Sequence, residues 1–201
     1  MSVGYKPKIA ILTIRNSYNY GGILTCVKQV YKFCEKYFDP TVFYLSFDKN
    51  ISANLKSLKF SSQTKKTKYF GMNAVEIGAR WAFWEPGHYS YTLDSWKEIL
   101  SEYDYFFVES GSCICAYPLV KLNKKFALWV AAAYQDDREK RIENLSLFRL
   151  LIEKITYPKM LEMEKLILNK ADFIWALSKD TKLRIDQILG HVRKKLLICN
   201  F

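Results

Sequence analysis

Hydrophobic residues near the N-terminus predict a strand, a helix and a second strand in succession. Residues 8–14 (KIAILTI) form a nearly continuous β-branched run, of the kind that is buried on both faces of a parallel sheet. From Ile23 onward, apolar residues recur every three or four positions, which is typical of a helix packed on a sheet. Pro40 opens a second apolar run over residues 41–47. These elements together predict a βαβ unit.

The middle of the chain mixes polar and apolar segments. Residues 50–72 are polar and rich in lysine, and they predict a loop or a short helix–strand pair. Residues 74–84 predict a helix, and Thr92 or Asp94 is expected to cap a second helix that ends at Leu100. The run YDYFFVE then predicts a strand over residues 103–109.

Alternation of strands and helices continues to the C-terminus. Pro158 is expected to begin a new helix within an amphipathic stretch, because proline fits a first turn and breaks an interior. The remaining predicted elements are a helix near 118–122, a strand at 126–132, the amphipathic stretch 145–170, a strand at 171–177, a helix at 179–189 between Ser178 and Gly190, and a strand at 195–201. The pattern predicts an α/β fold with a Rossmann-like, doubly wound, mostly parallel sheet flanked by helices, in a single domain over residues 1–201.

Cysteine and histidine usage argues against a metal site. The five cysteines stand at positions 26, 34, 113, 115 and 199 without a CxxC pair, and the chain has two histidines. Zinc sites need closely spaced ligands of these types, so no metal is expected. We interpret the cysteines as buried free thiols in a reducing compartment.

Charge and hydropathy restrict the location and the partners. The first residues contain an apolar run too short for a secretory signal, and no run is long enough to span a membrane, so we expect a cytoplasmic protein that is at most peripheral to a membrane. A formal net charge of +11 favours anionic partners, among them acidic lipid and phosphorylated substrates. No nucleic-acid-binding signature accompanies the charge, which argues against a nucleic-acid partner.

The first candidate site lies between the first strand and the first helix. In open α/β sheets ligands bind beyond the carboxyl ends of the strands. The segment 15–22 (RNSYNYGG) includes Asn19 and places Gly21 and Gly22 just before a helix, where bare backbone amides can approach a phosphate. The alternative is that the glycines only permit a tight turn.

Two further candidate sites follow later strands. Glu109, Ser110 and Gly111 leave the sheet together, which suits the binding of sugar hydroxyls or the capping of the next helix. The segment that begins at Tyr134 contains Asp136 and Asp137, either of which could serve as a general base or contact an acceptor. A solvated face at a helix start is the alternative for the two aspartates.

Three passages resemble the N-terminal, acceptor-side domain of GT-B glycosyltransferases, in particular family-four retaining glycosyltransferases. They are KIAILTI with YGGILTCVKQVYKF, then YDYFFVESG, and last EKLILNKADFIWALSKDTKLRIDQILGHVRKKLLICNF. The passages follow the family's order along essentially the whole chain. The family's closing strand runs into a linker to a second Rossmann domain, whereas this sequence stops after Cys199-Asn200-Phe201.

The resemblance implies the acceptor-binding half of an enzyme that moves a sugar from a nucleotide-sugar donor to a glycan, lipid or protein acceptor. It places the donor mainly in the absent second domain, so a donor-binding Rossmann domain or chain is the implied partner, and the isolated chain should be inactive. The donor is a co-substrate, and no cofactor is implied. The implied contacts are Gly21 and Gly22 to phosphate or acceptor and residues 109–111 as pocket lining, while the catalytic residues remain unidentified.

One departure from the family supports a different class of function. Many members have a histidine where this chain has Ala133 and Tyr134. Together with the basic charge, this departure favours the alternative hypothesis of a non-catalytic α/β scaffold, or of a basic module that binds a membrane surface or another anion.

Overall fold

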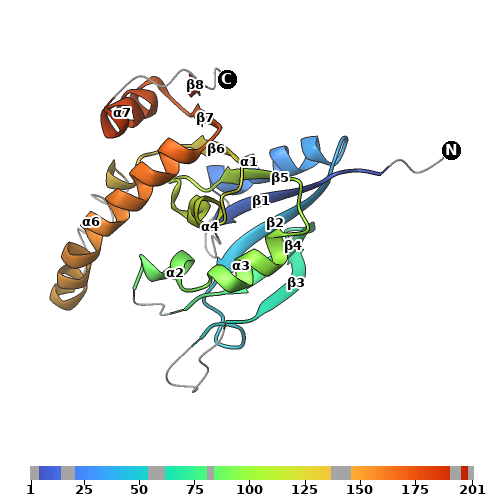
Figure 1. Cartoon of the computed structure of the whole chain (residues 1–201), viewed down its shortest axis with the longest axis horizontal. Coiled ribbons are helices and arrows are strands. Elements are labelled where there is room, and N and C mark those ends of the chain that lie inside the picture. Colours follow the sequence, from blue (N-terminus) through green and yellow to red (C-terminus); the bar gives the residue numbers. More distant parts are fainter. Residues whose placement is uncertain are drawn as a thin grey trace.

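Strands and helices alternate along most of the chain (Figure 1). The structure is a computed structural model that describes residues 5–14, 21–53, 62–80, 84–136, 146–190 and 196–198. The first half contains β1 (Lys8–Ile14), α1 (Gly22–Cys34), β2 (Asp39–Ser46), β3 (Thr64–Tyr69), β4 (Met72–Gly78), α2 (Gly87–Ser90) and α3 (Leu93–Leu100). The second half contains β5 (Tyr105–Glu109), the 3-10 helix η2 (Ile114–Ala116), α4 (Tyr117–Lys121), β6 (Ala127–Val130), α6 (Leu147–Lys170), β7 (Phe173–Ala176), α7 (Lys179–Leu189) and β8 (Leu196–Ile198).

The strands form one eight-stranded sheet in the order β3-β4-β2-β1-β5-β6-β7-β8. Every neighbouring pair is parallel except β3 with β4, which is antiparallel. From β1 the chain first adds strands on one side and then, from β5 onward, on the other. The predicted fold class, a mostly parallel Rossmann-like sheet, is therefore confirmed, and the order of strands reverses direction between β1 and β5.

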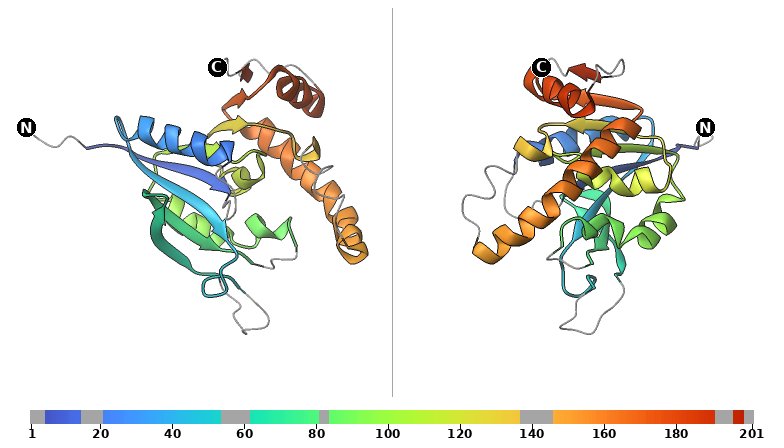
Figure 2. Two further views of the ribbon diagram at one scale, coloured as in Figure 1. Left: turned by 180° about the vertical axis from the view of Figure 1, so that it is seen from behind. Right: turned by 60° about the vertical axis from the view of Figure 1, so that its left-hand side comes forward.

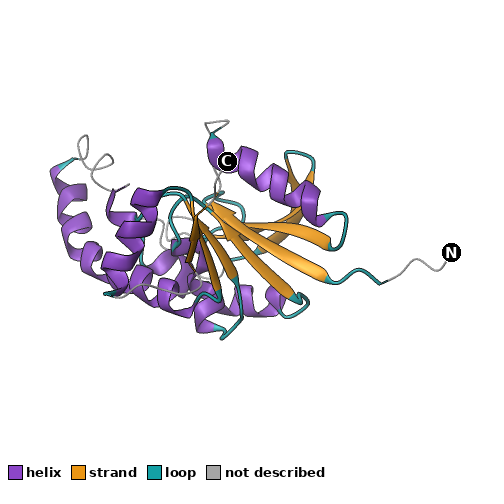
Figure 3. Ribbon diagram, turned by 90° about the horizontal axis from the view of Figure 1, so that it is seen from above, coloured by secondary structure: helices purple, strands orange, loops and turns teal. Residues whose placement is uncertain are grey.

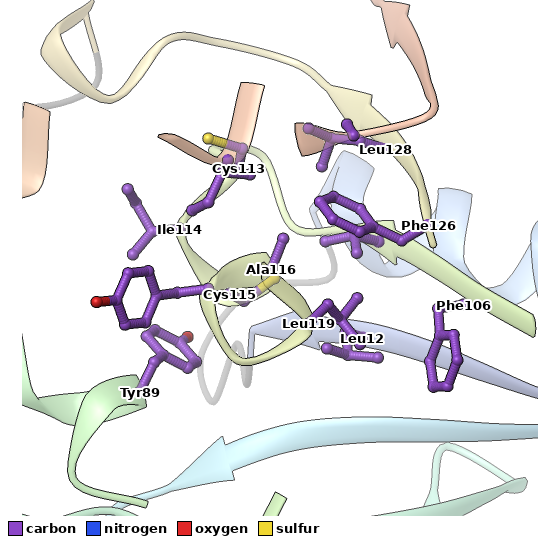
Figure 4. Packing of buried hydrophobic residues seen from close by; sticks show 14 of the residues in the cluster. Leu12, Tyr89, Phe106, Cys113, Ile114, Cys115, Ala116, Leu119, Phe126 and Leu128 are labelled. Atoms are coloured by element: carbon purple, nitrogen blue, oxygen red, sulfur yellow. The ribbon is translucent and has the colours of Figure 1, made fainter. Parts of the chain in front are cut away.

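Helices cover both faces of the sheet (Figure 3). On one face, α1 buries Leu24, Val27 and Tyr31 against β1, β2 and β4. The opposite face carries the larger core, to which α3, α4, α6 and α7 contribute. Figure 4 shows part of this core, where Leu12 of β1 lies near Leu119 of α4, and Leu128 of β6 lies near Phe126. Burial on both faces explains why β1 is a continuous apolar run in the sequence.

The helix predicted over residues 74–84 is wrong for its first part, because Met72–Gly78 is the strand β4. Residues 81–83 lie outside the described ranges. β4 pairs with both β2 and β3, and Ala74, Val75 and Ile77 are all buried. A strand covered on both faces has no alternating pattern, so its apolar run is easily read as helical.

The segment 50–72, predicted as a loop or a helix–strand pair, contains the strand β3, which forms a hairpin with β4. β3 pairs with β4 through the two-residue connection Phe70-Gly71, in which both residues have positive φ, 49° and 88°. Two-residue connections of this kind match the twist of an antiparallel hairpin. Residues 54–61 lie outside the described ranges.

The predicted break at Pro158 is also wrong, since α6 continues from Leu147 to Lys170 with Pro158 inside it. The predicted ends of α7 are confirmed. Ser178 is its N-cap, with Oγ accepting the backbone N–H of Thr181 at 3.1 Å, and Gly190 ends it with a left-handed φ of 71°.

Candidate functional site

Thr13 and Glu109 lie side by side at the carboxyl ends of β1 and β5. The last pair in the β1–β5 register is Leu12 with Val108, so Thr13 and Glu109 are the next residues on these parallel strands. Side chains alternate along a strand, and this places both residues on the α1 face with Ile11 and Phe107. The two residues therefore stand where the strand order reverses, the usual ligand position in such sheets.

Both side chains are buried and lack hydrogen-bond partners within the described residues. Thr13 is 2% exposed and Glu109 is 3% exposed, and neither Oγ1 of Thr13 nor Oε2 of Glu109 is paired. Burial raises the pKa of Glu109 from its usual value of 4.5 to about 8. A buried polar group without a partner costs about 1–3 kcal/mol, and such groups are rare in folded proteins. The pair forms an unsatisfied polar centre.

The first turn of α1 begins next to this polar centre. Gly21 is the N-cap with an extended backbone (φ −81°), and Gly22 lacks a positive φ. A Cβ atom added at Gly22 would meet no atom within 4 Å. Neither backbone conformation nor packing against the described residues therefore requires glycine at position 22, and these residues leave the space beside the first turn open. Asn19 lies outside the described residues.

Ser110 and Gly111 shape the exit of β5. Oγ of Ser110 donates to the carbonyl of Ser112, so this hydroxyl does not cap a helix. Gly111 has φ of 80°, and a Cβ atom there would lie 3.0 Å from Cδ1 of Ile23 in α1. Of the three residues 109–111, Glu109 alone offers an unpaired group, and Gly111 allows α1 to approach β5.

Tyr134 is held by a second buried carboxyl group. Its backbone N–H donates to Oε1 of Glu164 at 2.7 Å, and its hydroxyl donates to Oε2 of Glu85 at 3.1 Å. Tyr134 is 2% exposed, so its side chain is part of the core beneath the carboxyl edge of the sheet. Glu164 was not a sequence-based candidate, because a glutamate in an amphipathic helix carries no local signal of burial.

Asp136 forms an ion pair with Arg184 of α7, and its role as a base or acceptor contact stays a prediction. Oδ1 of Asp136 lies 3.3 Å from Nε of Arg184 in α7, and the Asp136 side chain is 48% exposed. This geometry agrees with the alternative of a solvated helix start. Asp137 lies outside the described residues, so its assignment stays a prediction.

The described cysteines agree with the expectation of free thiols. Cys34, Cys113 and Cys115 are buried, Cys26 is half-buried, and none of the four is in a disulfide. Burial raises the pKa of Cys115 to about 12, which leaves almost no thiolate at neutral pH. Within the described ranges, no group of three or more histidine, cysteine, aspartate or glutamate side chains is placed to hold a metal ion. No helix in those ranges is long and apolar enough to cross a membrane.

Comparison with known proteins gives similarity in structure alone. No family model matches the chain, and no curated protein matches its sequence. Sucrose-phosphate synthase from Thermosynechococcus elongatus is similar in structure, with a TM-score of 0.62 and 11% identity, over 96% of this chain and 47% of the synthase. An alpha,alpha-trehalose-phosphate synthase (UDP-forming) from Burkholderia vietnamiensis gives a TM-score of 0.48 and 9% identity, over 92% and 43% of the two chains.

The chain thus spans about half the length of the structures it matches. Sucrose-phosphate synthase is a glycosyltransferase by its name, and nearly all of the present chain superposes on part of it. The resemblance that the sequence suggests is therefore confirmed at the level of the fold.

Proposed function

We propose that this chain is the acceptor-binding half of a GT-B glycosyltransferase and that its binding site is the polar centre formed by Thr13, Glu109 and the first turn of α1. The observation that carries the proposal is the pair of buried polar groups, unpaired within the described residues, at the position where the strand order reverses. The likeness in fold to part of sucrose-phosphate synthase supports it.

The chemistry of the polar centre suits a sugar hydroxyl. With a pKa of about 8, the Glu109 carboxyl is mostly protonated near neutral pH, so it can both donate and accept a hydrogen bond. The Thr13 hydroxyl can do the same. A hydroxyl of the acceptor would satisfy both groups and remove the cost of leaving them unpaired.

The first turn of α1 suits a phosphate group of the donor or the acceptor. Backbone N–H groups at the start of a helix lack intrahelical partners and carry a partial positive charge. α1 has no acidic residue in its first turn to neutralise that charge, and no described residue fills the space beside Gly22. An anion at this position would lie next to the Thr13–Glu109 pair, because Gly111 and Ile23 bring α1 against β5.

The acceptor-binding half would position the acceptor and would not supply the main electrostatic stabilisation of the transition state. Holding an acceptor hydroxyl against a donor lowers the entropic barrier to transfer, while the charge that develops on the leaving diphosphate must be stabilised by the donor-binding half. Sugar transfer therefore requires a second Rossmann domain or chain, and the isolated chain binds without turnover.

Substitution of Thr13 by valine separates binding from folding. Valine has nearly the shape of threonine, and the lost hydroxyl has no partner in the described structure, so Thr13→Val should fold as well as the wild type. Acceptor binding should weaken by about tenfold, the usual worth of one hydrogen bond in a buried site. Binding is measured by saturation-transfer NMR with hexoses, hexose phosphates and UDP-sugars.

Thr156→Val is the matched control, because Thr156 is also buried but lies on α6, away from the polar centre, and its hydroxyl donates to the carbonyl of Glu153. This variant should bind sugars as the wild type does. The proposal fails if neither sugars nor nucleotide sugars bind the wild type, or if Thr13→Val binds them unchanged. In that case the alternative of a non-catalytic scaffold, favoured by the packed Ala133 and Tyr134, would hold. Transfer activity on addition of a donor-binding domain would extend the result from binding to chemistry.

A further inference from the structure

The helix α6 has two halves that differ in burial. Its C-terminal half packs into the core through Met160, Met163, Ile167 and Leu168. The N-terminal half, residues 147–159, projects away from the sheet in all three views of Figures 1 and 2. Thr156 is the only described residue in this projecting half that is fully buried.

An apolar stripe runs along the projecting half. It consists of four residues, which we call the α6 stripe: Leu147 (86% exposed), Leu150 (37%), Leu151 (57%) and Ile155 (60%). Their spacing of three and four residues places them on one side of the helix. Four large aliphatic side chains gathered on one exposed helix surface are unusual for a protein that meets only water, and they indicate an interaction surface.

The charges around the α6 stripe are mostly positive. Among the described residues of α6, the exposed charged side chains are Arg149, Lys154, Lys159, Glu162, Lys165 and Lys170, and Glu153 is half-buried. The single exposed carboxylate in this set, Glu162, is paired with Lys159 at 2.9 Å. Lys154 immediately precedes Ile155, and a helical spacing of three residues places it next to Leu151. The whole chain carries a net charge of +11.

We propose that the α6 stripe docks the protein onto an anionic lipid membrane. Aliphatic side chains with lysine and arginine among them are the composition of helices that lie in the membrane interface. The leucines and the isoleucine would enter the acyl boundary, while the stems of the lysines extend their ammonium groups to lipid phosphates. The helix lies along the surface and does not span it, in agreement with its hydropathy.

This inference does not rest on the proposed glycosyltransferase function. The α6 stripe is built from residues outside the polar centre of Thr13 and Glu109, so either proposal can fail while the other holds. If both hold, the acceptor site belongs to a protein that works at a membrane surface.

Sedimentation with lipid vesicles tests the docking. Wild-type protein should sediment with vesicles of phosphatidylcholine and phosphatidylglycerol, sediment little with phosphatidylcholine alone, and be released by high salt. The double variant Leu151→Gln/Ile155→Gln should lower the partition coefficient by about tenfold or more, because two apolar side chains no longer enter the bilayer. Lys154→Gln should give a smaller decrease that disappears at high salt.

Leu183→Gln is the matched control, since Leu183 is 59% exposed but lies on α7, outside the α6 stripe. It should bind vesicles as the wild type does, and circular dichroism should show that all variants are folded. The proposal is overturned if the wild type does not bind anionic vesicles or if the double variant binds them equally well. It is also overturned if sedimentation equilibrium shows a dimer that the double variant abolishes, because the stripe would then be an interface between two copies.

Discussion

The backbone N–H of Tyr134 donates a 2.7 Å hydrogen bond to Oε1 of Glu164, which ties the segment after β6 to the buried side of α6. Glu164 is 1% exposed, and its Oε2 has no hydrogen-bond partner within the described residues. Burial raises the pKa of Glu164 to about 7, although the Tyr134 N–H and Arg184 act in the opposite direction. The carboxyl group is therefore stable in the fold mainly in its neutral form.

Glu164→Gln should remove part of the dependence of stability on pH. Because the pKa in the folded state, about 7, lies above the usual 4.5, the neutral carboxyl contributes stability below about pH 4.5 that is lost as the pH rises through about 7. Glutamine keeps an oxygen for Tyr134 and cannot ionise. The variant should be more stable than the wild type at about pH 8, by on the order of 1–3 kcal/mol.

Urea unfolding across this pH range measures the effect. Glu162→Gln is the control, because the hydrogen bond with Lys159 lowers the pKa of this exposed carboxylate. This substitution should leave the decline in the free energy of unfolding between about pH 5 and 8 unchanged. A slope for Glu164→Gln equal to that of the wild type would show that folding does not raise the pKa of Glu164. Glu109, with a pKa of about 8, adds to the wild-type decline in the same direction.

Ser178→Ala should destabilise the start of α7. The Ser178 hydroxyl oxygen accepts the backbone N–H of Thr181 at 3.1 Å, and loss of such a cap costs about 1 kcal/mol. Ser146→Ala provides the comparison, because Ser146 is the N-cap of α6 and makes no side-chain capping hydrogen bond. Thermal unfolding followed by circular dichroism should show a lower Tm for Ser178→Ala and almost none of this loss for Ser146→Ala. Equal losses would contradict the capping role.

Gly78→Ala should strongly destabilise the end of β4. An added Cβ atom would lie 1.9 Å from the carbonyl oxygen of Ile51, a backbone atom that cannot rotate away. We expect a loss of about 2–4 kcal/mol in the free energy of unfolding, as for other overpacked sites where the backbone must shift. Gly22→Ala, where the added atom meets nothing within 4 Å, should change stability little. Urea unfolding measures the stability of both variants. If Gly78→Ala is as stable as the wild type, residues 51–52 can move to accommodate the added atom.

The sheet could be predicted where burial leaves a local signal. β1 and β5 are continuous apolar runs because both of their faces are covered, and the ends of α7 are marked by the capping serine and the left-handed glycine. β4 was misassigned because Glu76 within an apolar run resembles one turn of an amphipathic helix, and only pairing with β2 and β3 identifies it as a strand. Tertiary contacts of this kind have no local signature.

The candidate site could be predicted in part. Glu109 was identified because it ends a strand, and ligands in such sheets bind at strand ends. The sequence does not point to Thr13, because a threonine in an apolar strand usually finds a partner, and only the assembled sheet shows that its hydroxyl has none among the described residues. Likewise, the ion pair of Asp136 with Arg184 joins residues far apart in the sequence, so the sequence alone does not predict it.

Pro158→Ala should raise the stability of α6. The helix continues through Pro158, although proline has no N–H for the carbonyl of Lys154 and its ring crowds the preceding turn. Alanine restores the hydrogen bond and is the best helix former, while the unfolded chain gains some entropy, so we expect a net gain of about 1–2 kcal/mol. For a chain of this length, the Tm should rise by about 2–4 °C per kcal/mol.

Lys159→Ala is the neighbouring control, because Lys159 is exposed and its ion pair with Glu162 contributes little. A Tm for Pro158→Ala that rises well above both the control and the wild type would show that the proline strains the helix. A lower Tm would show the opposite, that Pro158 helps to bring Met160 and Met163 into the core while residues 147–159 project from it. In that case the proline, conspicuous in the sequence as a helix breaker, would separate the packed half of α6 from the α6 stripe without ending the helix.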